Sequence, residues 1–201
     1  TNIVVPGEPA HVIGTPDGNI NKAIIDAVVK LMGTFREAVG DSVDLCLDLN
    51  FNFKTEGFIK IARAVEPFNL MWVELDTYDP DALLQIKQST TTSICSAESL
   101  YLCRGYRPFL ERHALDVAMV DVPWNGLTES RRIAAMADSY EINIAPHNYY
   151  SHLSTYISSH LCASVPNVKI METDVDSPPW RDDIISELPQ IENGYMALPT
   201  R

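Results

Sequence analysis

Short apolar runs recur along the chain, and each one ends at or shortly before a polar residue. Successive polar residues are separated by 26, 24, 23, 26 and 25 positions. A repeat of this length is typical of strand–loop–helix units, so the pattern predicts βαβ units in a parallel sheet. The same end of each strand would then carry a polar side chain. The six positions are Asp48, Glu74, Glu98, Asp121, His147 and Glu172.

Apolar residues at helical spacing lie between these runs. A helix start is also recognisable at Asp79-Pro80, an N-cap followed by proline at the first helical position. Thr128 is expected to cap a later helix. The predicted helices cover about Ile20–Val39, Phe58–Val65, Asp81–Gln88, Arg131–Ser139 and Leu153–Leu161.

Two α/β folds fit this order of elements, a doubly wound open sheet and a (β/α)₈ barrel. A barrel is favoured, because all of its strand ends face one site, whereas an open sheet uses only those near its switch point. We count six complete units and a strand remnant at Thr1–Val5. We therefore expect residues 1–201 to be a single barrel domain, part of a longer chain and lacking at least the first barrel strand. The tail Pro178–Arg201 is expected to pack across the barrel or against a missing domain.

Composition narrows the classes of partner. The chain of 201 residues carries a formal net charge of −12 and no basic stripe, which argues against nucleic acid. Its apolar runs are far shorter than a membrane span, and no signal-peptide pattern is present. The four cysteines have no C-x-x-C spacing and are expected to be reduced and buried. We expect a cytoplasmic homo-oligomer that acts on a small molecule.

Three carboxylates would end consecutive strands: Asp48, Glu74 and Glu98. Two unit charges about 4 Å apart repel by roughly 4 kcal/mol at an effective dielectric of 20, so such a group needs protonation or a cation. Oxygen ligands without thiolates favour a hard cation, Mg²⁺ before Mn²⁺. An acid after a strand is often only the N-cap of the next helix. The common register of all three favours the metal site.

Asp121 and His147 would end the next two strands. An aspartate that accepts from one ring nitrogen fixes the tautomer and leaves the other nitrogen to move a proton. Glu172 would close the ring opposite the metal group, where a protonated carboxyl can donate to a charged substrate oxygen. His11, in the long loop Pro6–Gly18, is more simply explained as an exposed loop residue.

Several motifs resemble the barrel domain of the enolase superfamily, mandelate racemase subgroup, over roughly residues 20–198. They are Leu47-Asp48-Leu49-Asn50, Trp72-Val73-Glu74, Ala97-Glu98-Ser99-Leu100-Tyr101, Leu115–Asp121 with Gly126-Leu127-Thr128-Glu129, Ala145-Pro146-His147, and Ser159-His160-Leu161 through Pro166-Asn167 to Met171-Glu172.

The resemblance implies a (β/α)₇β barrel of the enolase C-terminal kind, present here as a partial barrel without the N-terminal capping domain. It implies that Asp48, Glu74 and Glu98 bind Mg²⁺. The substrate carboxylate would bind this ion, and loss of the adjacent proton would give an enediolate.

The same resemblance assigns roles around the substrate. His147, paired with Asp121, would be the base or the acid that expels a leaving group, while Glu172 and Asn50 would reach the substrate carboxylate. Specificity would depend on Pro6–Gly18, on Tyr149 and Tyr150, and on the part that precedes Thr1, where the family's lysine motif would fall. Two departures affect the substrate pocket: Leu75-Asp76 after the metal glutamate, and Trp124-Asn125-Gly126 after the dyad aspartate.

The expected reaction is a Mg²⁺-dependent dehydration of a sugar acid. A racemase or epimerase of a 2-hydroxy acid shares the same half-reaction and is the second choice. A cycloisomerase is a weaker third, because those relatives generally use paired lysines. A non-catalytic barrel with a binding or structural role is the alternative of another class. The sequence does not name the sugar acid.

Overall fold

A computed structural model describes residues 17–174, 178 and 180–198. The remnant Thr1–Val5, His11 and most of the loop Pro6–Gly18 lie outside the described residues. The chain forms two compact units. The first contains the described residues up to Ser96 together with Arg112–Asp116, and the second contains Ala97–Glu111 and the described residues from Val117 onward.

The first unit alternates strands and helices, as the apolar pattern predicts. Its strands β1, β2 and β3 are parallel neighbours in chain order. In the pairing of β1 with β2, Asp48 lies opposite Glu74, so two of the predicted metal ligands end adjacent strands in register. The elements are α1 (Lys22–Val39), β1 (Cys46–Asp48), α2 (Thr55–Val65), η1 (Glu66–Phe68), β2 (Trp72–Glu74), α3 (Pro80–Lys87) and β3 (Ile94–Ser96).

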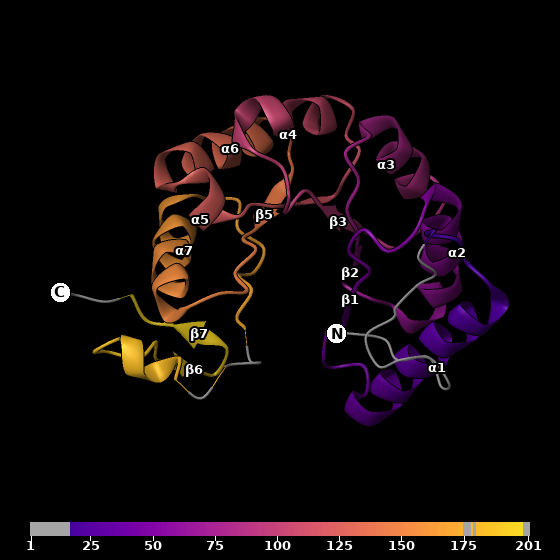
Figure 1. Ribbon diagram of the computed structural model, residues 1–201, viewed down its shortest axis with the longest axis horizontal. Coiled ribbons are helices and arrows are strands. Elements are labelled where there is room, and N and C mark those ends of the chain that lie inside the picture. The colour runs from indigo at the N-terminus through magenta and orange to yellow at the C-terminus, as the bar shows by residue number, and fades with distance from the viewer. Residues whose placement is uncertain (1–16, 175–177, 179, 199–201) are drawn as a thin grey trace. The chain divides into compact units, whose positions relative to one another are not determined.

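Helices α1, α2 and α3 pack in sequence along one side of these strands (Figure 1). The predicted apolar face of α2 is buried at all four positions, Phe58, Ile61, Ala62 and Val65. Helix α3 begins as predicted: the Asp79 carboxylate accepts from the backbone N–H groups of Asp81 and Ala82, and Pro80 is the first helical residue.

The second unit contains parallel strands β4 and β5, paired from Val117↔Asn143 to Met119↔Ala145. Helix α6 packs against α4, α5, α7 and β5 (Figure 1). The elements are α4 (Leu102–Glu111), β4 (Val117–Met119), α5 (Val122–Asn125), α6 (Leu127–Ser139), β5 (Asn143–Ala145), α7 (His152–Ser164), η2 (Asp182–Ile184), β6 (Ile191–Glu192) and β7 (Tyr195–Met196).

The strand expected before Glu172 is reduced to one parallel bridge, between Ile144 and Val168. The Ile144 N–H donates to Asn167, and the Ile144 carbonyl accepts from Lys169. The next ladder residue of β5 would be Pro146, which has no N–H to donate, so the ladder stops there. The Pro146 carbonyl instead accepts from the Glu172 N–H at 3.3 Å. Glu172 therefore remains tied to the segment that leads to His147.

Four further expectations need correction. Helices α4 and α5 have no counterpart in the predicted elements. Thr128 is not a cap, because α6 begins one residue earlier with Gly126 at the N-cap. The tail, which was expected only to pack across the barrel or against a missing domain, contains the antiparallel hairpin β6–β7. All four cysteines are free, as expected, but only Cys95 is buried: Cys103 and Cys162 are partly buried and Cys46 is exposed.

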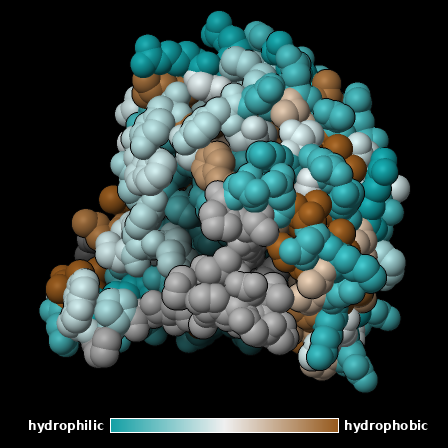
Figure 2. Space-filling view, turned by 45° about the vertical axis from the view of Figure 1, so that its right-hand side comes forward, coloured by the Kyte–Doolittle hydropathy of each residue, from teal (hydrophilic) through white to brown (hydrophobic). Residues whose placement is uncertain are grey.

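Figure 2 shows a mostly hydrophilic face in which apolar residues occur singly or in small groups. On α1, for example, Phe35 is 37% exposed while Ile24 and Val28 are buried, so the apolar stripe of this helix is only partly covered. Within the described residues, every helix is too short or too polar to traverse a lipid bilayer.

Candidate active site

The second unit brings Asp121 and His147 together. Strands β4 and β5 pair at Met119↔Ala145, and each of the two site residues lies two positions further along its chain. Because the strands are in this register, the Asp121 and His147 side chains lie next to each other just beyond the strand ends. Nδ1 of His147 lies 2.7 Å from Oδ2 of Asp121. Because a carboxylate only accepts, this contact makes Nδ1 the protonated nitrogen and leaves Nε2 for proton transfer.

Asp121 is fully buried and accepts three hydrogen bonds. Oδ1 accepts from the backbone N–H of Trp124 at 2.8 Å, which makes Asp121 the N-cap of α5. Oδ2 accepts from His147 and from the hydroxyl of Tyr150 at 2.6 Å. The residue is therefore both a helix cap and the partner of the imidazole. Three donors offset the cost of burying its charge.

The second ring nitrogen of His147, Nε2, lies near two acids of the same unit. Nε2 of His147 lies 3.4 Å from Oε2 of Glu98 and 3.9 Å from Oε2 of Glu172. Burial by itself lowers the pKa of His147, but the hydrogen bond to Asp121 and the negative charges of Glu98, Glu172 and Asp121 outweigh it. Together they raise the pKa of His147 to about 9. In the metal-free chain the imidazole is thus protonated at neutral pH.

Glu172 is held by the residue that follows the histidine. Oε2 of Glu172 accepts from the backbone N–H of Asn148 at 2.7 Å, and the Asn148 side-chain amide donates to the Glu172 carbonyl at 3.0 Å. Asn148 is fully buried and also bonds to Ser154 and Thr155 at the start of α7. The Glu172 side chain keeps about a third of its surface exposed, so it can still face a ligand.

The aromatic side chain of Tyr150 contacts this cluster. The ring of Tyr150 meets the imidazole of His147 edge to face, with centroids 5.4 Å apart at 85°. Tyr101 and Trp124 stack nearly parallel at 5.4 Å and are each about half exposed. Burial, reinforced by the hydrogen bond to Asp121, holds the pKa of Tyr150 far above its usual range, so its hydroxyl stays a donor. Tyr149, the predicted substrate contact, is 49% exposed.

The remaining predicted ligands belong to the first unit. Oδ1 of Asp48 accepts from the Asn50 backbone N–H at 2.8 Å, and Glu74 accepts from the indole N–H of Trp72 at 3.2 Å. Asn50 has a left-handed backbone (φ 47°), and its side-chain oxygen accepts from the Phe51 N–H at 2.8 Å. A substrate carboxylate only accepts hydrogen bonds, so the predicted contact would use the side-chain N–H₂ group of Asn50.

Hard oxygen donors at paired positions of β1 and β2 suit Mg²⁺. Across the described part of the chain, no group of three or more His, Cys, Asp or Glu side chains is arranged to hold a metal ion. Asp48 and Glu74 belong to one unit and Glu98 to the other, so the metal site of three carboxylates stays a prediction.

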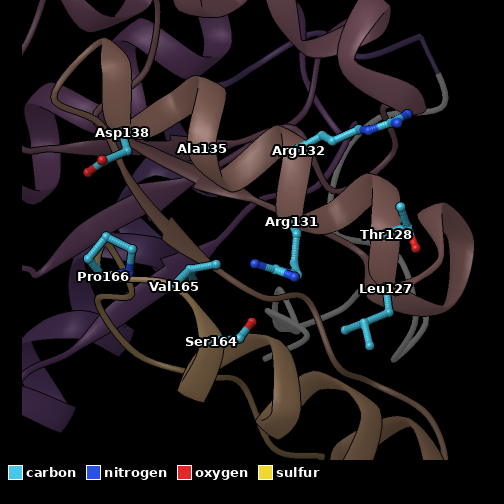
Figure 3. Close-up of a pocket in the computed structure, with 9 residues that line it drawn as sticks. All are labelled: Leu127, Thr128, Arg131, Arg132, Ala135, Asp138, Ser164, Val165 and Pro166. Carbon is cyan, nitrogen blue, oxygen red and sulfur yellow. The ribbon is translucent and has the colours of Figure 1, made fainter.

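A cavity of about 530 Å³ lies along α6 and the end of α7. Figure 3 shows Arg131 directed from α6 toward Ser164, with Asp138 at the far end of the same helix. None of the predicted site residues lines this cavity. It is therefore separate from the cluster around His147.

Sequence reasoning missed the groups that hold the acid–imidazole cluster in place. Tyr150 was expected only as a determinant of specificity, and Asn148 was not singled out. Both follow His147 within three residues. A polar run directly after the histidine is the signal that could have identified them, because residues of a short loop after a strand are the nearest source of further donors.

The chain matches the family model described as "Enolase C-terminal domain-like" over residues 13–201. D-xylonate dehydratase of Haloferax volcanii is 34% identical over 181 residues, which cover 88% of this chain and 44% of the relative. L-talarate/galactarate dehydratase of Salmonella typhimurium is 27% identical, with 86% and 42% covered. The chain thus spans less than half the length of these curated relatives.

Solved structures agree with these matches. A Burkholderia xenovorans strain LB400 protein, named as a candidate L-alanine-DL-glutamate epimerase and bound to magnesium and fumarate, superposes with a TM-score of 0.89 at 40% identity. The superposition covers 92% of this chain and 46% of that one. A mandelate racemase/muconate lactonizing enzyme-like protein of Rubrobacter xylanophilus gives 0.84 at 34% identity, with 90% and 48% covered. The expected enolase-type barrel fold class is confirmed by these matches.

Proposed function

Since this chain belongs to the enolase C-terminal domain-like family, we propose that it forms the catalytic barrel of a Mg²⁺-dependent sugar-acid dehydratase. The single observation that carries the proposal is the contact of His147 Nδ1 with Asp121 Oδ2 at 2.7 Å. It prepares Nε2 to exchange a proton with a bound molecule. The similarity to D-xylonate dehydratase and to L-talarate/galactarate dehydratase supports a sugar acid as the substrate class.

Asp48, Glu74 and Glu98 are the residues that we propose hold the cation. A bound Mg²⁺ would supply Lewis acidity at the substrate carboxylate, which makes the neighbouring C–H more acidic. The magnesium bound by the Burkholderia xenovorans relative supports this choice of metal. Glu172, held by Asn148 at one oxygen, is proposed to contact the substrate carboxylate, together with Asn50 and Tyr149.

The chain's own residues would manage the protons. In dehydration the C–H bond next to the carboxylate breaks, and the C–O bond at the following carbon breaks with its electron pair leaving as hydroxide. As the acid, the imidazolium of His147 would protonate this hydroxide, so water leaves and the imidazole becomes neutral, while a base from the lysine motif expected before Thr1 would take the carbon-bound proton. As the base, neutral Nε2 would take the carbon-bound proton and, as imidazolium, give it to the leaving hydroxide. Asp121 keeps the other nitrogen protonated in both roles.

An epimerase or racemase is the second candidate. It is favoured by the 40% identity to the candidate L-alanine-DL-glutamate epimerase. Racemisation of a 2-hydroxy acid would begin with removal of the same proton as dehydration. Returning a proton to the opposite face of the carbon would invert the centre without loss of water. A non-catalytic barrel remains the alternative of another class. The cytoplasmic location and the homo-oligomeric state also stay predictions.

Substrate screening separates these functions. The full-length protein is incubated with a panel of sugar-acid diastereomers in D₂O, with Mg²⁺ or with EDTA. A dehydratase forms a 2-keto-3-deoxy acid only in the presence of Mg²⁺. An epimerase gives inversion and deuterium at the carbon next to the carboxylate, and a binding protein gives neither. Formation of keto acid at the same rate in EDTA would exclude the proposed metal dependence.

A further inference from the structure

Tyr150 contacts both members of the Asp121–His147 pair. Its hydroxyl donates to Oδ2 of Asp121 at 2.6 Å, the same oxygen that faces Nδ1 of His147. Its ring meets the imidazole edge to face at 5.4 Å. The Tyr150 side chain thus contacts both the Asp121 carboxylate and the His147 imidazole. It lies three residues after the histidine.

The carboxylate of Asp121 has no access to solvent. Its orientation is therefore set by protein donors: the Trp124 N–H at Oδ1, and the Tyr150 hydroxyl with the imidazole at Oδ2. If the hydroxyl is removed, Oδ2 of Asp121 loses one of its two donors, and one constraint on rotation of the carboxylate is lost. The imidazole then loses part of the support that fixes the direction of Nε2.

We propose that Tyr150 is a positioning residue, whose hydroxyl fixes the Asp121 carboxylate and thereby the direction of His147 Nε2. The inference rests on the proposed proton-transfer function and adds a residue to it. A positioning residue affects the chemical step more than substrate binding, because it does not touch the substrate. This distinguishes it from a specificity residue, whose loss would raise KM.

The first test is Tyr150→Phe in the full-length protein with Mg²⁺, because this change keeps the ring and removes only the hydroxyl. We expect kcat to fall about tenfold or more, since a hydrogen bond to a charged group is lost. KM should stay within about twofold of wild type on this account. Tyr156→Phe is the matched control, since the Tyr156 hydroxyl also donates one hydrogen bond in this unit, to the Glu187 carbonyl at 3.0 Å. A rise in KM with unchanged kcat would overturn the proposal.

A double substitution shows whether Tyr150 acts through Asp121. In an Asp121→Ala background the hydroxyl has lost its acceptor, so adding Tyr150→Phe should change kcat by no more than about twofold. If Tyr150→Phe costs about tenfold in that background as well, the hydroxyl acts on the substrate directly and the proposal is wrong.

A measurement that needs no substrate tests the role of Tyr150 independently of the proposed function. The Nδ1 proton of His147 should exchange slowly with solvent in the wild type and in Tyr156→Phe, as seen in proton NMR of ¹⁵N-histidine-labelled protein. Tyr150→Phe should accelerate this exchange by about tenfold or more, since the buried carboxylate is less fixed. If no sugar acid is turned over, the proposed function fails while this exchange still tests Tyr150. Equal exchange in folded wild type and Tyr150→Phe would contradict the positioning role.

Discussion

Asp121 and His147 form a hydrogen-bonded pair at the ends of adjacent parallel strands, with Oδ2 and Nδ1 2.7 Å apart. The pair follows from register alone, because Met119 faces Ala145 and both residues lie two positions further on. A shift of one residue between these strands would turn the two side chains to opposite faces. Local strand pairing therefore builds the centre of the site.

Asp121→Asn should both weaken the fold and lower activity. The amide keeps one oxygen to accept from the Trp124 N–H, but it presents an N–H₂ group to His147 Nδ1 and to the Tyr150 hydroxyl, in a position closed to water. We expect a loss of about 1–3 kcal/mol in the free energy of unfolding, and a fall in kcat of about 10²–10⁴-fold. Urea unfolding and steady-state kinetics measure the two effects. Asp138→Asn, at an exposed position of α6, should leave both near wild type.

His147 should titrate near pH 9 in the protein freed of metal with EDTA. The folded chain then binds the proton more tightly than the unfolded chain, whose histidine pKa is about 6.5. The stabilisation is complete below about pH 6.5 and is lost as the pH rises through about 9. Histidine NMR gives the pKa, and denaturant titrations between these values give the stability, which His147→Gln should make less dependent on pH. A pKa at or below 6.5 in the metal-free protein would contradict the described electrostatics.

Removing a predicted metal ligand should weaken Mg²⁺ binding. Asp48→Asn and Glu74→Gln each withdraw one charged oxygen ligand, and we expect affinity to fall by at least about tenfold. Isothermal titration calorimetry on the full-length protein measures this loss. Asp44→Asn is the control, because Asp44 precedes β1 and is exposed. Equal affinity in Asp48→Asn and in the control would exclude Asp48 as a ligand.

Asp79→Ala should destabilise the chain modestly. Oδ1 of Asp79 accepts from two backbone N–H groups at the start of α3, at 2.9 and 3.2 Å. Loss of an N-cap of this kind typically costs about 1 kcal/mol. Denaturant unfolding should show this loss, whereas Asp138→Ala, within the exposed side of α6, should change stability by less than about 0.5 kcal/mol.

Local patterns in the sequence predict a helix correctly where no second local signal, such as an internal proline, opposes them. Helix α2 follows from its apolar spacing and α3 from its cap, and both are found. Helix α4 was missed because Pro108 lies within it and proline normally ends a helix. Its buried residues Tyr106, Phe109 and Leu110 show that packing outweighs this local signal.

The residues of the candidate site that lie at strand ends could be predicted from the sequence. The spacing of Asp121 and His147 anticipates their contact, since neighbouring strands in register bring their ends together. Tyr150 and Asn148 were not predictable in their observed roles, because they lie in a loop whose path no periodic pattern describes. The strand before Glu172 was overestimated, because the missing N–H of Pro146 ends its ladder after one bridge.

The rate of keto-acid formation by His147→Asn, measured in the full-length protein with Mg²⁺, tests the central claim most directly. His160→Asn is the matched control, since His160 is an exposed histidine of α7. We predict that His147→Asn lowers kcat by about 10²–10⁴-fold while His160→Asn stays within about twofold of wild type. A folded His147→Asn variant that forms the product as fast as the control would contradict proton transfer by the Asp121–His147 pair.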